Sequence, residues 1–145
     1  MSIQLTADTD GYYASASVYS VWVIARSGSI TSPSTNAFTS TGRVLMTVEG
    51  LIASPATAIN LFSYAESVPD APSFITVTET GLVAAMGAYS DGIGFYYAGS
   101  ELRNAGTVTG NIGVRFGDGQ DALVSNDGYI FWGPPTGSSI RPASG

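Results

Sequence analysis

The sequence contains no lysine, no histidine and no cysteine among its 145 residues. The absence of cysteine excludes a disulfide scaffold and a thiolate nucleophile. Without histidine or lysine there is no imidazole general base, no Schiff-base amine and no phosphate-binding lysine of a P-loop. Enzymes that depend on these groups are therefore excluded, and only carboxylates remain as acid and base candidates.

Positive charge is scarce as well, because five arginines face eleven acidic residues and the net charge is −6. Nucleic acids and anionic membrane surfaces select basic patches, so we expect neither as a partner. Residues 1–8 have neither the basic nor the apolar region of a signal peptide. The most apolar stretches, residues 18–25 and 82–88, are too short to span a bilayer.

The residues that are abundant are glycine, serine, threonine and alanine, together with β-branched and aromatic residues. With 44% hydrophobic and 11% charged residues, this composition is typical of an all-β protein with many short strands and turns. A chain of this length can bury a core of its own without metal or disulfide cross-links.

Five glycines, at positions 28, 50, 81, 106 and 128, mark a repeat along the chain. A β-branched residue stands two positions after each glycine, and an apolar residue stands four positions before it; the two sets are Ile30, Ile52, Val83, Val108 and Ile130, and Ile24, Met46, Val77, Leu102 and Val124. Repeat lengths mostly in the twenties, with apolar and polar residues alternating, predict a β-solenoid. We expect the glycines to supply the positive φ of a tight corner.

The predicted fold is a parallel β-helix of about five coils, and the alternative is an antiparallel β-sandwich. Residues 1–17 are predicted to form an N-terminal cap, residues 18–132 the solenoid, and residues 133–145 a tail rich in Gly, Pro and Ser. Residues 66–72 are polar and contain two prolines, so we expect a loop there.

Residues 104–110, 114–123 and 126–128 resemble the N-x-G-x-I-x-G … F-G-D-G-x-D repeats of bacterial autotransporter and haemagglutinin-type adhesins. The match covers about residues 101–130, and the earlier repeats keep the glycine and apolar positions but lack the Asn and the Gly-Asp-Gly-x-Asp element. The resemblance implies that the β-helix is right-handed.

The Gly-Asp-Gly-x-Asp element at residues 117–121 also resembles one unit of the calcium-binding RTX repeat. That resemblance implies calcium at Asp118, Asp121 and Asp127. Because the RTX ion lies between successive turns and only one copy is present, the favoured interpretation is a turn with solvated aspartates and no cofactor.

Carboxylates that could act as an acid–base pair in sugar cleavage are Glu79, Glu101, Asp118 and Asp121. Solvated acidic side chains near corners are the favoured interpretation of these residues. We therefore predict that the protein is not an enzyme.

Strand alternation places Ile130 and Trp132 inward and Tyr129 and Phe131 outward. Two adjacent outward aromatic residues would form an apolar patch, which Tyr96 is expected to extend. Tyr12, Tyr13, Tyr19 and Trp22 are expected to enrich the other end of the chain in the same way. The alternative is that these aromatic residues belong to end caps of the solenoid. We predict a homo-oligomer in which the patch and the tail, with Ile140 and Arg141, pack between copies.

These features favour a structural protein that forms or decorates a virion-surface or extracellular assembly, such as a fibre, spike or filament subunit. One alternative is a carbohydrate-binding adhesin or tailspike module whose exposed aromatic residues stack on a cell-surface glycan. Another is a calcium-stabilised RTX-like secreted module.

Overall fold

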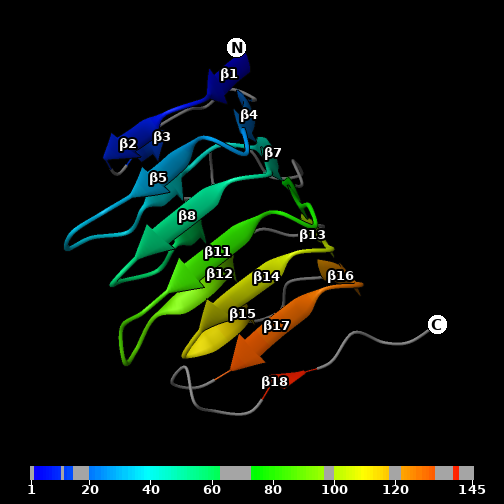
Figure 1. The fold of residues 1–145 in the computed structure, drawn as a ribbon. Coiled ribbons are helices and arrows are strands. Elements are labelled where there is room, and N and C mark those ends of the chain that lie inside the picture. The colour runs from blue at the N-terminus through cyan, green and yellow to red at the C-terminus, as the bar shows by residue number, and fades with distance from the viewer. Residues whose placement is uncertain are drawn as a thin grey trace.

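The computed structural model of the protein describes residues 2–10, 12–14, 20–62, 73–96, 100–117, 122–132 and 139–140. Every regular element in this part of the chain is a β-strand, and there are 18 of them (Figure 1). None of the described residues belongs to a helix that is long and apolar enough to cross a membrane. The expectation of an all-β protein is confirmed.

The strands form three sheets, and neighbouring strands of each sheet follow one another in the order below. Sheet A contains β1 (Ser2–Leu5), β4 (Ser20–Ile24), β7 (Val44–Val48), β10 (Phe74–Val77), β13 (Ser100–Asn104) and β16 (Ala122–Asn126). Sheet B contains β2 (Asp8–Asp10), β5 (Ser29–Thr31), β8 (Leu51–Ser54), β11 (Leu82–Ala85), β14 (Thr107–Gly110), β17 (Tyr129–Trp132) and β18 (Ser139–Ile140). Sheet C contains β3 (Tyr12–Ala14), β6 (Phe38–Ser40), β9 (Ile59–Leu61), β12 (Asp91–Phe95) and β15 (Ile112–Phe116).

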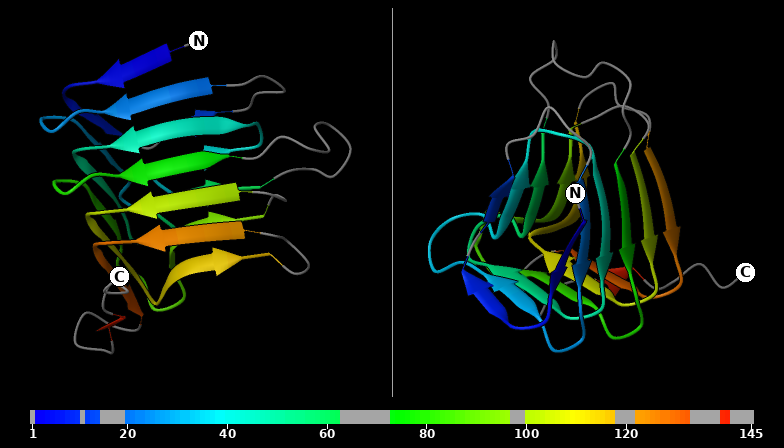
Figure 2. Two further views of the ribbon diagram at one scale, coloured as in Figure 1. Left: turned by 90° about the vertical axis from the view of Figure 1, so that its right-hand side faces the viewer. Right: turned by 90° about the horizontal axis from the view of Figure 1, so that it is seen from above.

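Consecutive strands enter sheets A, B and C in turn, so that each strand from β1 to β14 pairs with the strand three positions later. All of these pairs are parallel, and only β17 and β18 are antiparallel within the described residues. Figure 2 shows the strands stacked along one axis, with the three sheets around a shared interior. This is the strand order expected of a parallel β-helix, and it rules out the antiparallel β-sandwich.

The predicted column of inward β-branched residues in sheet B is confirmed. Its members pair in register from one strand to the next, and all are buried: Ile30, Ile52, Val83, Val108 and Ile130. The same alternation holds in β4, β7, β10 and β13 of sheet A, whereas β6 and β12 of sheet C are buried along their whole length. Trp22 of sheet A packs edge-on against Phe38 of sheet C with ring centroids 5.1 Å apart. Trp22 therefore belongs to the core and not to an exposed aromatic patch.

The apolar residues four positions before each glycine do not form a single column. Ile24 pairs with Val48, and Met46 pairs with Trp22, so Ile24 and Met46 lie on neighbouring inward columns of sheet A. The reason is that the corner from sheet A to sheet B has two residues at 49–50 and four residues at 25–28. A fixed distance from the glycine therefore does not mark a fixed place on the strand.

The corner glycines are also needed for a different reason from the one expected. None of them has a φ between +20° and +160°, so no left-handed conformation is involved. A Cβ at Gly50 would lie 2.2 Å from the carbonyl oxygen of Gly28, and a Cβ at Gly128 would lie 2.1 Å from that of Gly106. Glycine is required because each corner packs directly on the backbone of the corner before it.

Asparagines strengthen the last two of these corners. Asn104 is buried, and its Nδ2 donates to the Oδ1 of Asn126 at 2.7 Å and to the carbonyl oxygen of Tyr129 at 3.2 Å. Its own Oδ1 accepts a hydrogen bond from the backbone N–H of Gly106 at 3.2 Å. The repeated Asn-x-Gly motif therefore corresponds to two corners, at residues 105–106 and 127–128, that lie one above the other.

The two ends of the stack differ. Within the segment 1–17, the strands β1, β2 and β3 are the first members of sheets A, B and C. In the tail, β18 pairs antiparallel with β17, which covers that edge of sheet B. The loop predicted at residues 66–72 lies outside the described residues.

Candidate interaction surfaces

The two aromatic residues predicted to face outward from β17 form a stacked pair on the outer face of sheet B. Tyr129 is 52% exposed, and its ring centroid lies 6.0 Å from that of Phe131, with an angle of 15° between the rings. Ile130, which lies between them in the sequence, is buried, and Trp132 is partly buried against the core. We call Tyr129 and Phe131 the aromatic pair.

Among the described residues, the outward positions of β8, β11, β14 and β17 carry no charged side chain. In register with the pair, β14 presents Thr107 and Thr109. The two strands before it, β8 and β11, present only leucine and alanine at the equivalent positions. Met86, which directly follows β11, is 65% exposed. The outward positions of these four strands are therefore uncharged, and those of β17 are the aromatic ones.

The predicted interface residues of the tail are only partly described. Ile140 lies in β18, where its backbone is opposite Ile130 of the same chain. Arg141 lies outside the described residues.

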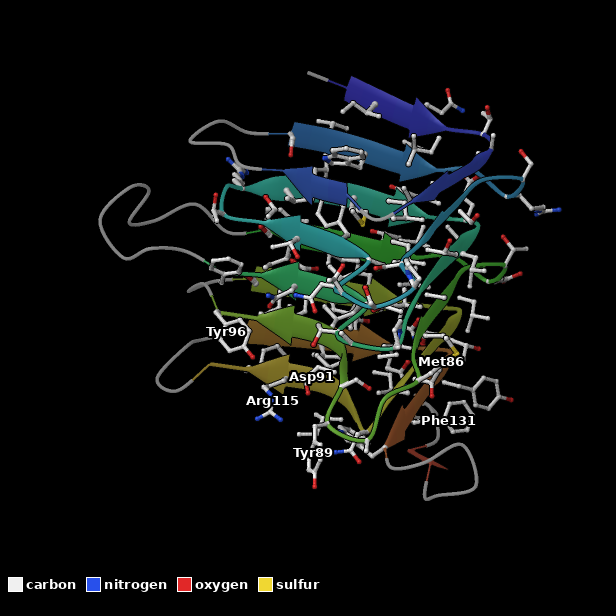
Figure 3. All side chains as sticks on the ribbon, turned by 90° about the vertical axis from the view of Figure 1, so that its left-hand side faces the viewer. Met86, Tyr89, Asp91, Tyr96, Arg115 and Phe131 are labelled. Carbon is white, nitrogen blue, oxygen red and sulfur yellow. The ribbon has the colours of Figure 1, made fainter. Side chains whose placement is uncertain are left out.

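Tyr96 does not lie with the aromatic pair. It follows β12 in sheet C, is 37% exposed, and appears on the opposite side of Figure 3 from Phe131. Its ring covers Gly94, because a Cβ at that glycine would lie 3.0 Å from Cε2 of Tyr96. Close by, the Nε of Arg115 donates to the Oδ2 of buried Asp91 at 2.8 Å.

The electrostatics of this cluster keep Tyr96 and Arg115 in their ordinary charge states. Burial, and then the nearby Asp91 carboxylate, raise the pKa of Tyr96, while Arg115 lowers it. The hydrogen bond to Asp91 raises the pKa of Arg115 above its ordinary value. Tyr96 is therefore neutral and Arg115 charged at neutral pH, and the Asp91–Arg115 pair links β12 to β15.

The outer face of sheet A is hollowed in two adjoining places. The first hollow has a volume of about 220 Å³ and is lined by Leu45, Phe74, Ile75, Thr76, Glu101 and Arg103. The second has a volume of about 330 Å³ and is lined by Thr76, Val77, Thr78, Glu79, Arg103, Asn104, Ala105, Ser125 and Asp127. Because Thr76 and Arg103 line both, the hollows form one groove across β10 and β13, which we call the sheet A groove.

The predicted carboxylates occupy different parts of this groove. Glu101 lies in the first hollow, where its Oε1 accepts from the Nε of Arg103 at 2.7 Å. Glu79 is exposed in the four-residue corner at 78–81 and lines the second hollow. Sequence reasoning identified both acids but missed Phe74, Thr76 and Arg103. Alternation alone places these three outward, but only the strand register shows that they are neighbours.

The predicted calcium ligands are divided between described and undescribed parts of the chain. Asp118 and Asp121 lie outside the described residues. Asp127 is exposed in the two-residue corner between β16 and β17. Within the described residues, no three acidic side chains come together as a metal site.

Comparison with known proteins adds no relative. No family model matches the chain, no curated protein matches its sequence, and no solved structure matches its fold.

Proposed function

We propose that the protein is a non-enzymatic structural subunit of a fibre, spike or filament, located on a virion surface or outside the cell. We propose further that it folds as a right-handed parallel β-helix of about five coils. The cyclic order of strands through sheets A, B and C supports the helix. The hand is supported by the rule that connections between parallel strands of one sheet are right-handed in nearly every known case.

The observation that carries the proposal is the aromatic pair on the outer face of sheet B, at strands β8 to β17, whose described outward positions carry no charge. Tyr129 and Phe131 are held outward by a strand whose alternate residues are buried in the core. Aromatic residues are enriched at protein interfaces and charged residues are depleted from their centres. A second copy of the chain can therefore cover this face without desolvating a charge.

The arrangement of carboxylates supports a non-enzymatic role. Cleavage of a glycosidic bond needs two carboxyl groups on either side of one bond, one of them free to donate a proton. Glu101 is held in an ion pair with Arg103, and Glu79 lines the other hollow of the groove. Neither residue faces an obvious acid–base partner in the described part of the chain.

The preceding strand provides a matched design for the test. Tyr129 and Phe131 pair in register with Thr107 and Thr109, so the double variant Tyr129→Thr/Phe131→Thr gives β17 the outward residues of β14. Threonine keeps the β-propensity of the strand. We expect the native chain to be oligomeric in multi-angle light scattering and the double variant to be monomeric. A native chain that is monomeric at all concentrations, or a double variant that assembles like the native chain, would contradict the proposal.

A further inference from the structure

We propose that the sheet A groove binds a neutral saccharide. This inference does not depend on assembly through sheet B, because the groove and the aromatic pair belong to different sheets. It is based on the side chains that meet in the groove, which come from three strands distant in sequence.

The floor of the first hollow is apolar and held in place. Phe74 and Leu45 are in-register neighbours on β10 and β7, and both line the hollow. The guanidinium carbon of Arg43 lies 5.9 Å from the centroid of the Phe74 ring, which is within the range of a cation–π contact. Small-ligand sites typically combine such an apolar floor with a few placed polar groups. The face of a pyranose ring formed by its C–H groups fits against an aromatic ring in this way.

The polar groups beside this floor suit vicinal hydroxyls. The ion pair uses Nε of Arg103 and Oε1 of Glu101, and within the described part of the chain neither side chain makes a further hydrogen bond. The two terminal amino groups of Arg103 are donors, and the second oxygen of Glu101 is an acceptor. A sugar hydroxyl can accept a hydrogen bond from an amino group of Arg103 and donate one to the second carboxylate oxygen of Glu101. Hydrogen bonds to charged groups are stronger than those between neutral groups.

Charge in the groove favours a neutral sugar over an acidic one. Three acidic side chains, Glu79, Glu101 and Asp127, and one arginine, Arg103, line the two hollows, and a second arginine, Arg43, lies over the Phe74 ring. Acidic groups still exceed arginines by one, so a uronic or sialic acid would add to an excess of negative charge. The second hollow, at about 330 Å³, reaches the lower end of the range of small-ligand sites, roughly 300–1,000 Å³, and the first, at about 220 Å³, adjoins it.

The test is a titration followed by two-dimensional amide NMR with two sets of probes. The neutral set consists of short gluco-, manno- and galacto-oligosaccharides, and the acidic set consists of oligogalacturonate and oligosialate. With a neutral probe at up to about 10 mM, well above a dissociation constant of about 1 mM, we expect shifts that concentrate on residues 74–76 and 101–103. Acidic probes should leave these resonances unchanged.

Two variants locate the site, and one neighbouring residue provides the control. Thr76→Val should weaken the binding of the neutral probe about fivefold, because one hydrogen bond is lost. Arg103→Gln should weaken it by about tenfold or more, since a bond to a charged group is lost. Thr47 is the in-register neighbour of Thr76 on β7 and lines neither hollow, so Thr47→Val should bind like the native chain.

Each outcome decides the proposal. If no neutral probe shifts the groove resonances, or if acidic probes shift them more strongly, the proposal is overturned. It is also overturned if Thr47→Val weakens binding as much as Thr76→Val, because the bound sugar would then lie elsewhere. Loss of oligomerisation in the aromatic-pair variant has no bearing on this result, so the two proposals can fail separately.

Discussion

The two corners that bound sheet B differ in how much their lengths vary. From sheet A to sheet B the chain takes two residues at 6–7, 49–50, 105–106 and 127–128, and four residues at 25–28 and 78–81. From sheet B to sheet C the connections are far less uniform: six residues at 32–37, four at 55–58, five at 86–90 and one at position 111. The A–B corner therefore has only two lengths, whereas the described B–C connections vary from one to six residues.

Both corners combine backbone and side-chain hydrogen bonds. At the A–B corner, the N–H of Gly50 donates to the carbonyl oxygen of Ile24 at 3.0 Å, and Oγ1 of Thr80 donates to that of Glu49 at 2.8 Å. At the B–C corner, the N–H of Met86 donates to the carbonyl oxygen of Ser54 at 2.9 Å, and the N–H of Thr57 donates to Oδ1 of Asn36 at 3.2 Å. The two corners therefore differ in the range of their lengths and not in the kind of bond that joins their layers.

The largest expected effect comes from adding one methyl group at the A–B corner. Gly50→Ala places a Cβ 2.2 Å from the carbonyl oxygen of Gly28, which is backbone and cannot move without shifting the corner. We expect the free energy of unfolding to fall by about 3 kcal/mol or more, measured by urea denaturation.

The matched control for this change is a glycine inside a strand. At Gly94 an added Cβ would meet only side-chain atoms, 3.0 Å from Tyr96 and 3.5 Å from Asn60. Gly94→Ala should change stability by about 1 kcal/mol or less. Equal losses at Gly50 and Gly94 would show that close packing of backbones is not what the corner requires.

The next effect tests the asparagines of the A–B corner. Asn104→Ala removes bonds to Asn126, to the carbonyl oxygen of Tyr129 and to the N–H of Gly106 in a buried position. We expect a loss of about 2–3 kcal/mol in the same denaturation experiment. Asn126→Ala removes only the first of these bonds and should cost about 1 kcal/mol. A larger loss of unfolding free energy for Asn126→Ala than for Asn104→Ala would show that Asn104 is not the main stabilising asparagine of this corner.

At the B–C corner, removing a buried side-chain hydroxyl is expected to cost less stability than Asn104→Ala. Ser54→Ala removes a buried hydroxyl that donates to Thr35 and accepts from the N–H of Ala56 at 2.9 Å. The expected loss is about 1–2 kcal/mol by thermal or urea denaturation. Ser27→Ala removes an exposed hydroxyl bonded to the carbonyl oxygen of Thr6, and it should change stability by about 0.5 kcal/mol or less.

The smallest expected effect is that of lengthening the B–C corner. Pro33 and Ser34 are exposed, and a Gly-Ser insertion between them extends a connection that already has six residues. Such an insertion should cost about 1 kcal/mol or less, because closure entropy rises slowly with loop length. The same insertion between Ala105 and Gly106 should destabilise the protein far more. If both insertions cost the same, the contrast between the two corners does not hold.

Much of the fold was predictable because burial follows local alternation. The column from Ile30 to Ile130 was found from spacing alone, and Ile130 inward with Tyr129 outward followed from the same alternation. The inward columns of sheet A cannot be found from the distance to the glycine, because a four-residue and a two-residue corner both end in glycine. Which side chains of a strand face inward follows from local alternation, whereas the register between neighbouring strands depends on the lengths of the corners that join them.

The sheet A groove was less predictable than the aromatic pair. Tyr129 and Phe131 lie two positions apart on one strand, so alternation along the sequence predicts that both side chains face outward. Leu45, Phe74 and Glu101 are far apart along the chain and become neighbours only through the pairing of β7, β10 and β13. Glu101 was identified as a carboxylate, but its ion pair with Arg103 gives it a different role from the one considered.

The sequence by itself determined which side of most strands faces the core, since successive side chains of a strand point to opposite faces. How far each side chain is buried depended on its neighbours, because Val124 on β16 is 36% exposed whereas its in-register neighbour Leu102 is fully buried. The tertiary structure decided what each corner glycine is for and which surface residues share a groove. Both depend on the distance between one layer of backbone and the next, and that distance exists only once the layers are stacked.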